Sequence, residues 1–429
     1  MIRLISFFVL LFTFASASDM SAQTLTELFN FTGTSGALPN GAMAITSTHN
    51  LVGATNAGGS ANFGVVYICS PLSQSVEVLH NFAGGDTDGA NPQGRVVLDA
   101  SGSIYGTTSG GGPAGAGSVW KMTPPVNGSS SWTFSILYFF NGGNDGADPI
   151  AGLMFGNGGV LFGTTNGGGA TGDGTVFELN PPATTGDPWT EQVIYAFSGT
   201  DGSQPHSDLS MDANGVLYGT TKFGGASNKG TAYSLTPPTA GGAWTEAVLH
   251  SFTGRTFHAG DSEGSYPYGG LFVGSAGVLY GTTSKGSVNP FDGAGTFYSL
   301  TPPAAAGGAW TINHLLDFEG GFNPEYPEFP IADLVQDSSG NLWTSADGGS
   351  LSEGTIVELV APTGTNGWTA NVAATFFGPS FSPPANGSFP HAGLVQDSTG
   401  AFFGVTEQGG EYCVQYETYG CGTIFELMP

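Results

Sequence analysis

Short apolar segments recur along this chain, each bounded by glycine, proline, asparagine or aspartate. One unit shows the spacing at 151–156 (AGLMFG), 160–165 (VLFGTT), 174–179 (GTVFEL) and 189–197 (WTEQVIYAF). None of these segments keeps a helical period over ten or more residues, and β-branched and aromatic residues dominate them. The pattern therefore predicts four short β-strands per unit, which we call A, B, C and D in chain order.

Strand B repeats seven times, usually as apolar residues, an aromatic residue, Gly-Thr-Thr and then more glycine. Its glycine slot is filled by Gly53, Gly106, Gly163, Gly219, Gly281, Thr344 and Gly404. These slots recur every 53 to 63 residues, and such a regular recurrence is the signature of a repeat architecture. We therefore expect seven similar units in a single domain that spans residues 24–429.

The connections between strands indicate how each unit folds. Strands A and B are joined by tight turns such as DASGS, DANG and DSSG, which are typical of hairpins. Strand C is followed by Pro-Pro in four units, and proline ends strand pairing because it lacks the amide donor. Each unit is therefore predicted to be a four-stranded antiparallel sheet.

One such sheet is apolar on both faces and cannot be stable alone in water. Seven sheets arranged radially cover each other's faces, so the sequence predicts an all-β, seven-bladed β-propeller. In this arrangement we expect the slot glycine to let neighbouring sheets approach, while the aromatic residue before it fills the gap between them.

The two ends of the repeat region predict how the ring closes. The chain starts with a D-type segment at 24–31 (TLTELFNF) and finishes with a C-type segment at 422–429 (GTIFELMP). The last blade thus lacks the strand with which the chain begins. We expect these two segments to pair, which leaves no open sheet edge.

Three segments together resemble a known bacterial repeat: DGANP (88–92), the GxxYGTTxxGG pattern and GTVFELNPP (174–182). They are similar to the GloVer tandem repeat of exported proteins, over about residues 24–429. The resemblance implies a secreted or surface-exposed protein and brings no catalytic residues with it. Residues 334–349 (LVQDSSGNLWTSADGG) also resemble the propeller repeats of two-component regulators, which points to the same fold.

The first residues predict export. Arg3 precedes an apolar run at 4–14, and small residues follow it at 15–17. This order is typical of a secretory signal peptide at residues 1–17, with cleavage after residue 22 as the alternative. The apolar run is too short for a membrane-spanning helix, which needs about 20 residues. We expect a protein that is secreted or held at the cell surface and is not inserted in the membrane.

The net charge of the chain limits the classes of partner that it is expected to bind. Seven Lys plus Arg residues stand against 33 Asp plus Glu, which gives a formal net charge of −26. Such a field repels the phosphates of nucleic acids, so nucleic acid is not an expected partner. The apolar fraction of 39% is nevertheless high enough for a buried core. We expect a folded, acidic monomer.

The three cysteines have two predicted fates. Cys413 and Cys421 bracket a short segment, and a disulfide between them is expected in an exported protein. Cys69 aligns with Leu179, which occupies an apolar core slot of strand C. We expect a buried free thiol there.

The longest loops lie between strands D and A or between B and C of blades 5 to 7, and these loops share one face of the predicted ring. We place any binding surface on that face; the alternative is that the loops are merely tolerated insertions. All seven tryptophans fall in regular repeat slots, which leaves tyrosines as the candidates for ligand contact. These are Tyr266, Tyr268, Tyr326, Tyr412, Tyr416 and Tyr419.

Two histidines stand apart from the repeat pattern. His206 and His391 each follow a proline at the start of an innermost strand, beside the expected channel mouth. With Asp208 and Asp333 at equivalent slots, they are candidates for a ligand site, a metal site or a general acid and base. The alternative is an ordinary polar surface.

The D-to-A loops carry acidic residues and glycine, for example GGDTDGANP (84–92) and AGDSEGSYP (259–267). Asp86, Asp88, Asp261 and Glu263 are the candidate ligands for calcium. Position 97 is a valine, so the first loop lacks the glutamate of an EF-hand. The alternative is that aspartate and glycine serve the turns.

Two functions follow from these features. The first hypothesis is a non-catalytic binding or surface-interaction module for an extracellular glycan or protein. The second is an enzyme, such as a lyase of the streptogramin-lyase kind, with a histidine–carboxylate site at the channel mouth. Catalysis requires one of the two histidines within hydrogen-bond reach of a carboxylate in a pocket, whereas binding requires only an exposed rim rich in tyrosine.

Overall fold

The computed structural model describes residues 23–125, 131–184, 186–239, 241–254, 263–286, 294–305, 307–318, 327–348, 353–364, 366–377, 386–410 and 420–429. The predicted signal peptide lies outside these ranges. Within them the regular elements are β-strands and four short 3-10 segments: η1 (Gly85–Thr87), η2 (Gly143–Asp145), η3 (Asn157–Gly159) and η4 (Ser275–Gly277). No helix in the described part of the chain has the length and apolar character that crossing a membrane demands.

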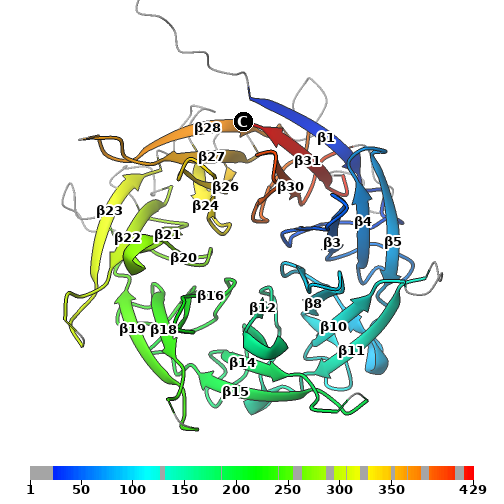
Figure 1. Ribbon diagram of the computed structural model, residues 1–429, viewed down its shortest axis with the longest axis horizontal. Coiled ribbons are helices and arrows are strands. Elements are labelled where there is room, and N and C mark those ends of the chain that lie inside the picture. Colours follow the sequence, from blue (N-terminus) through cyan, green and yellow to red (C-terminus); the bar gives the residue numbers. More distant parts are fainter. Residues whose placement is uncertain are drawn as a thin grey trace, which may run out of the picture.

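Seven antiparallel sheets are arranged in a ring (Figure 1). Blade 1 contains β2 (Ala44–Ile45), β3 (Leu51–Thr55), β4 (Val65–Ser70) and β5 (Ser75–Asn81). Blade 2 contains β7 (Val97–Leu98), β8 (Ile104–Thr108), β10 (Ser118–Thr123) and β11 (Thr133–Phe139). Blade 3 contains β12 (Met154–Phe155), β13 (Leu161–Thr165), β14 (Thr175–Asn180) and β15 (Thr190–Ala196). Blade 4 contains β16 (Ser210–Met211), β17 (Leu217–Thr221), β18 (Thr231–Thr236) and β19 (Thr245–Ser251).

The remaining three blades follow the same order. Blade 5 contains β20 (Phe272–Val273), β21 (Leu279–Thr283), β22 (Thr296–Thr301) and β23 (Thr311–Asp317). Blade 6 contains β25 (Val335–Gln336), β26 (Leu342–Gly348), β27 (Thr355–Val360) and β28 (Thr369–Thr375), with β24 (Glu328–Pro330) added to β26. Blade 7 contains β29 (Val395–Gln396), β30 (Phe402–Thr406), β31 (Thr423–Met428) and β1 (Thr24–Asn30). Outside the blades, β6 (Gly89–Ala90) pairs with β9 (Gly110–Gly111). The predicted seven-bladed propeller is confirmed.

The ring closes as the sequence predicts. Strand β1 pairs antiparallel with β31, from Thr24 opposite Met428 to Asn30 opposite Thr423. The first strand of the described chain is thus the outermost strand of the seventh blade. In Figure 1 the dark blue strand lies beside the red one at this junction. Closure removes the unpaired edge that a linear stack would expose.

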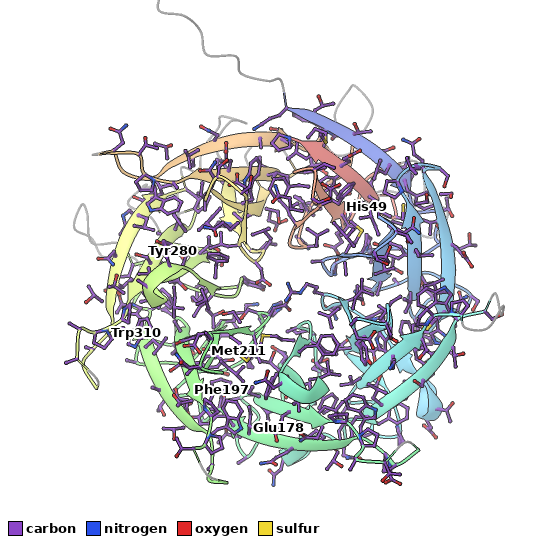
Figure 2. The ribbon with its side chains drawn as sticks, in the orientation of Figure 1. His49, Glu178, Phe197, Met211, Tyr280 and Trp310 are labelled. Atoms are coloured by element: carbon purple, nitrogen blue, oxygen red, sulfur yellow. The ribbon has the colours of Figure 1, made fainter. Side chains whose placement is uncertain are left out.

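A separate apolar cluster fills each of the seven interfaces between adjacent blades. The aromatic residue before the glycine slot takes part, as predicted: Tyr218 of blade 4 packs with Tyr298 and Leu279 of blade 5. Figure 2 shows side chains crowding these interfaces, with Met211 nearer the centre of the ring than Trp310. Because burial of apolar area is the main stabilising term, the ring is stabilised chiefly between blades rather than within them.

The role expected for the slot glycine is corrected by the structure. A Cβ added to Gly219 would lie 2.5 Å from the Tyr233 hydroxyl, and Tyr233 is the residue opposite Gly219 on strand C of the same blade. The glycine therefore makes room for a ring of its own blade rather than for a neighbouring sheet. Blade 6 shows the reverse substitution, because Thr344 fills the slot and the smaller Val357 lies opposite it.

Local polar contacts account for the tight A-to-B turns. The Asp212 carboxylate accepts hydrogen bonds from the amides of Asn214 (2.8 Å) and Val216 (3.0 Å). Asp337 and Asp397 form the same contacts in blades 6 and 7. These aspartates thus serve the hairpins.

Cys69 is free and fully buried in the interface between blades 7 and 1, which confirms the sequence prediction. Burial raises the pKa of its thiol to about 12, so the thiol stays protonated at neutral pH.

Candidate functional site

The D-to-A and B-to-C loops lie on one face of the ring, as predicted. In five blades an isolated bridge joins the two loops, for example Ser203 with Phe223 in blade 4 and Ser388 with Gln408 in blade 7. The β6–β9 pair does so in blade 2 and the β24–β26 pair in blade 6. We call this the loop face.

Seven residues on the loop face share an unusual backbone conformation. Each directly precedes a proline and has a positive φ between 54° and 62°: Leu38, Asn91, Asp148, Gln204, Tyr266, Phe329 and Phe389. This region is strained for residues other than glycine. Hydrogen bonds hold it in place; the Tyr266 amide donates to the Lys229 carbonyl of the preceding blade (2.8 Å), and the Tyr266 carbonyl accepts from the Ser284 amide (3.1 Å). This arrangement fixes the residue that follows each proline at the centre of the ring.

A pocket of about 530 Å³ lies at the centre of this face, and all seven blades contribute to it. Three repeat positions supply most of its polar side chains. The first position directly follows the proline and includes Asn40, Gln93, His206, Tyr268 and His391. The second lies two residues further on and includes Arg95, Asp208 and Asp333. The third lies three residues after the glycine slot of strand B and includes Ser284, Asp347 and Glu407.

His391 is held between two carboxylates. Its Nε2 lies 2.7 Å from Asp347 Oδ1 of blade 6, and its Nδ1 lies 2.7 Å from Glu407 Oε2 of its own blade. Burial alone would lower the pKa of His391, but the two hydrogen-bonded carboxylates outweigh it and raise this pKa to about 9. At neutral pH the imidazole is therefore charged, and both ring N–H groups are engaged.

His206 occupies the equivalent position in blade 4 and has the opposite surroundings. Its ring centroid lies 4.5 Å from that of Tyr268, and Lys222 donates a hydrogen bond to the Tyr268 hydroxyl. Burial and the nearby Lys222 ammonium lower the pKa of His206 to about 4. This imidazole is therefore neutral at pH 7. No hydrogen bond joins it to a carboxylate among the described residues.

A third cluster in the pocket contains charged groups and joins blades 2 and 4. Arg95 Nε of blade 2 lies 3.0 Å from Asp208 Oδ2 of blade 4, across the intervening Gly152 of blade 3. A Cβ at Gly152 would lie 2.8 Å from both Asp208 Oδ1 and the Arg95 Cβ, so this contact requires glycine. The amides of Gly152 and Gly270 donate to Asp208 and Asp333, at 2.5 Å each.

Asp333 shares this deep site with Asp208. Burial, followed by repulsion from the Asp208 carboxylate, raises the pKa of Asp333 to about 7 despite the nearby Arg95. A buried carboxyl whose pKa is raised in this way is partly protonated at neutral pH.

The structure brings together all four candidate catalytic residues, His206, His391, Asp208 and Asp333, as lining of one pocket. The two histidines do not contact each other and belong to separate clusters. Sequence analysis missed Arg95, Asp347 and Glu407. A signal for Arg95 was present, because Arg95 occupies the same position after its proline as Asp208 and Asp333.

The candidate ligand-binding tyrosines are only partly described. Tyr266 and Tyr268 are half-buried on the loop face, and Tyr268 lines the pocket. Tyr326, Tyr412, Tyr416 and Tyr419 lie outside the described residues. The expected tyrosine-rich rim thus stays a prediction beyond these first two.

The candidate calcium ligands take part in local contacts where they are described. The Asp88 carboxylate accepts from the Ala83 amide (2.9 Å) and lies 3.2 Å from His80 Nε2. Glu263 lies 3.4 Å from His250 Nε2. Asp261 lies outside the described residues, and Asp86 is exposed in η1. Across the described ranges no group of three or more such side chains has an arrangement that would hold a metal ion.

Cys421 is disulfide-bonded, whereas Cys413 lies outside the described residues. The Cys413–Cys421 pairing therefore stays a prediction.

Several solved structures resemble this one, and they belong to proteins of different kinds. A putative 6-phosphogluconolactonase from Bacteroides uniformis is 13% identical, with 88% of this chain and 98% of that chain covered and a TM-score of 0.50. A polysaccharide lyase, ulvan lyase, bound to -[GlcA(1-4)Rha3S]- is 10% identical, with 92% and 93% covered and a TM-score of 0.50. A putative oxidoreductase from Thermus thermophilus is 12% identical, with 95% and 100% covered and a TM-score of 0.44. At these identities the likeness concerns the fold alone.

Sequence comparison gives a more specific result. No curated protein sequence matches this chain. The family model described as the Gloeobacter/Verrucomicrobia repeat matches residues 92–357. Because this match covers more than half of the chain, the protein belongs to the Gloeobacter/Verrucomicrobia repeat family.

Proposed function

We propose that this protein is an exported, non-catalytic binding module that holds an extracellular glycan in the central pocket of the loop face. The observation that carries the proposal is the pocket itself. Its volume of about 530 Å³ falls within the usual range for ligand sites, roughly 300–1,000 Å³. Every blade contributes to its lining, and the backbone at its rim is fixed by the hydrogen bonds that hold the positive-φ residues.

Neutral hydrogen-bonding groups on the side of blades 1 and 2 favour a sugar as the ligand. Asn40 lines the pocket, and its buried Oδ1 has no hydrogen-bond partner within the described part of the chain. Gln93 donates to the Ser109 hydroxyl at 3.1 Å and also lines the pocket. Buried polar atoms without partners are uncommon, and a ligand hydroxyl would satisfy the Asn40 carbonyl.

The state of the two histidines favours binding over catalysis. His391 is protonated at neutral pH and donates through both ring nitrogens, so it has no free lone pair with which to act as a base. His206 is neutral, but no carboxylate orients it among the described residues. A general base needs a free nitrogen and is efficient when its pKa lies near the working pH, whereas the pKa of His206 is lowered to about 4.

Pocket filling tests the binding proposal. Gly393 lines the pocket, and an added Cβ there would lie in ordinary contact with the Ala42 Cβ (3.6 Å) and the Asp333 Cβ (3.8 Å). We expect Gly393→Leu to fold normally and to reduce glycan affinity at least about tenfold, because the side chain occupies ligand space. The measurement is isothermal titration with a panel of neutral and acidic oligosaccharides.

Ser338→Leu is the matched control, because Ser338 is exposed in the A-to-B turn of blade 6, on the opposite face. This variant should bind as the native protein does. Glycan binding that Gly393→Leu leaves intact would place the ligand elsewhere. The absence of binding to every member of the panel would overturn the proposal.

A second candidate function is an enzyme of the lyase kind, and one observation favours it. His391 meets the geometric requirement for catalysis, because two carboxylates lie 2.7 Å from its ring inside the pocket. If this function is correct, incubation with a bound glycan releases shorter products, and His391→Gln abolishes the release while the glycan still binds. Unchanged chain length of the glycan after prolonged incubation contradicts it.

A further inference from the structure

Three of the chain's seven Lys and Arg residues lie together in the B-to-C loops of blades 4 and 5. Lys222 follows β17, Lys229 precedes β18 and Lys285 follows β21. The structure joins none of the three to a carboxylate within the described part of the chain, although the sequence contains 33 acidic residues. We call these three residues, with Tyr266 and Tyr268, the lysine–tyrosine cluster.

Two of the three lysine ammonium groups donate hydrogen bonds to tyrosine hydroxyls rather than to carboxylates. Lys222 Nζ donates to the Tyr268 hydroxyl and lies 4.4 Å from the centroid of that ring. Lys229 Nζ donates to the Tyr266 hydroxyl at 2.5 Å and lies 4.6 Å from its centroid. A phenol is a neutral acceptor, so these contacts orient the two charges without neutralising them. Lys285 is exposed at the edge of the pocket.

Nearby described carboxylates are engaged with other groups. Glu263 lies 3.4 Å from His250 Nε2 and accepts from the Thr253 hydroxyl at 2.9 Å. Asp201 accepts from the Tyr195 hydroxyl and from the Ser198 amide. The three ammonium groups therefore form a local positive patch on a strongly acidic molecule. Such a concentration of unpaired like charge is unfavourable unless a ligand compensates it.

We propose that the lysine–tyrosine cluster binds acidic groups of the ligand, so that the glycan held in the pocket is one that carries carboxylate or sulfate groups. This inference rests on the proposed function, because it names the class of glycan for that same pocket. Tyr268 and Lys285 of the cluster line the pocket, and Lys222 donates to the Tyr268 hydroxyl. The neutral amides of Asn40 and Gln93 line it elsewhere, which matches a sugar that has one charged edge and several hydroxyls.

The large negative charge of the protein does not prevent such binding. At physiological ionic strength the Debye length is about 8 Å, so carboxylates on the far blades are largely screened. Lysines in direct contact with the ligand are screened much less. The field of the whole protein slows the approach of every polyanion, and only those that contact this cluster gain interactions that offset the repulsion.

The test compares matched ligand pairs that differ only in charge. Oligogalacturonate and its methyl ester test the carboxylate, and sulfated and unsulfated dextran oligosaccharides test the sulfate. We expect the native protein to bind at least one charged member of these pairs about tenfold or more tightly than its neutral partner. Affinity for that member should fall as salt rises, because ammonium–anion contacts contribute to it.

Lysine variants test whether the cluster is the source of the preference for a charged ligand. Lys285→Gln should weaken binding of the charged member about fivefold, and the triple variant of Lys222, Lys229 and Lys285 to glutamine should weaken it at least tenfold. Lys121→Gln is the matched control, since it removes the same charge from a lysine that lies 3.8 Å from Asp99 on blade 2. Its affinity should change by less than twofold.

The outcomes separate this inference from the proposed function. Equal affinity for charged and neutral partners, lost in Gly393→Leu and unaffected in the triple lysine variant, would uphold glycan binding and overturn the acidic-glycan inference. Binding of a poly-glutamate peptide as tight as that of the charged glycan would also overturn it, since the cluster would then select charge without sugar. Failure of every glycan to bind would overturn both.

Discussion

His206 and His391 occupy the same repeat position, each directly after the proline of its blade, yet they carry opposite charge states. His391 is charged because Asp347 and Glu407 face it, and its pKa is raised to about 9. His206 is neutral because it is buried and Lys222 lies nearby, and its pKa is lowered to about 4. The backbone is the same in both blades, so the scaffold does not determine the charge.

The residue that follows strand B in the same blade explains much of the difference in pKa between the two histidines. Blade 4 has Lys222 at this position and blade 7 has Glu407. The preceding blade adds a second contribution at the same position, which is Asp347 for His391. One scaffold can therefore present either a cationic or a neutral imidazole at the pocket, according to one or two side chains on adjacent loops. The comparison makes three predictions, given from the largest expected effect to the smallest.

Removal of the His391 imidazole should lower the free energy of unfolding far more than removal of the His206 imidazole. His391→Leu leaves two carboxylates facing each other without the cation between them, so we expect a loss of about 3 kcal/mol in the free energy of unfolding at pH 7. His206→Leu replaces a buried neutral ring and should cost less than about 1 kcal/mol. Urea denaturation followed by tryptophan fluorescence measures both. Equal losses would show that the charge states do not differ.

The stabilising contribution of His391 should depend on pH. Folding raises its pKa from 6.5 to about 9, so the contribution is fully present below about pH 6.5 and is lost as the pH rises through 9. The stability difference between the native protein and His391→Leu should shrink by about 2 kcal/mol between pH 7 and pH 9.5. Because the buried acid Asp333 titrates in both proteins, the difference isolates the histidine. A constant difference over this range would contradict the assignment.

An acid at the blade 4 position should make His206 more like His391. In Lys222→Glu the repulsive ammonium is replaced by an attractive carboxylate, so the pKa of His206 should rise from about 4 by an amount equivalent to about 1.4 kcal/mol. It should stay below 6.5, because burial, the larger cause of its depression, is unchanged. Titration of the His206 ring protons by NMR provides the measurement. A pKa that stays near 4 would show that burial alone determines it.

The sequence was sufficient for the architecture and for the location of the pocket. Strand pattern, turn residues and the D-type and C-type ends predict the closed ring, and repeat position alone brings His206, His391, Asp208 and Asp333 to the channel mouth. These features depend on local residue types and on the repeat spacing, and both can be read directly from the sequence. The partners of these residues are not visible in this way. Arg95 reaches Asp208 across a whole blade, and this contact depends on the width of the channel and on the missing side chain of Gly152.

The positive-φ residues show a second limit of sequence analysis. Leu38, Gln204 and Phe389 share no side-chain chemistry, and none is a residue that favours this conformation. The hydrogen bonds to the preceding blade and to the same blade impose it, so only the assembled ring reveals it. This tertiary constraint overrides local preference at the rim of the pocket, where the site residues need fixed positions.

The pairing of β1 with β31 has a consequence for biogenesis. Strand β1 can pair with β31 only after β31 has been synthesised, so six blades can assemble on a growing chain while the seventh must wait. A folding chain therefore carries an unpaired β1 until β31 is available. Any factor that binds the chain during that interval must keep this strand from pairing with another molecule.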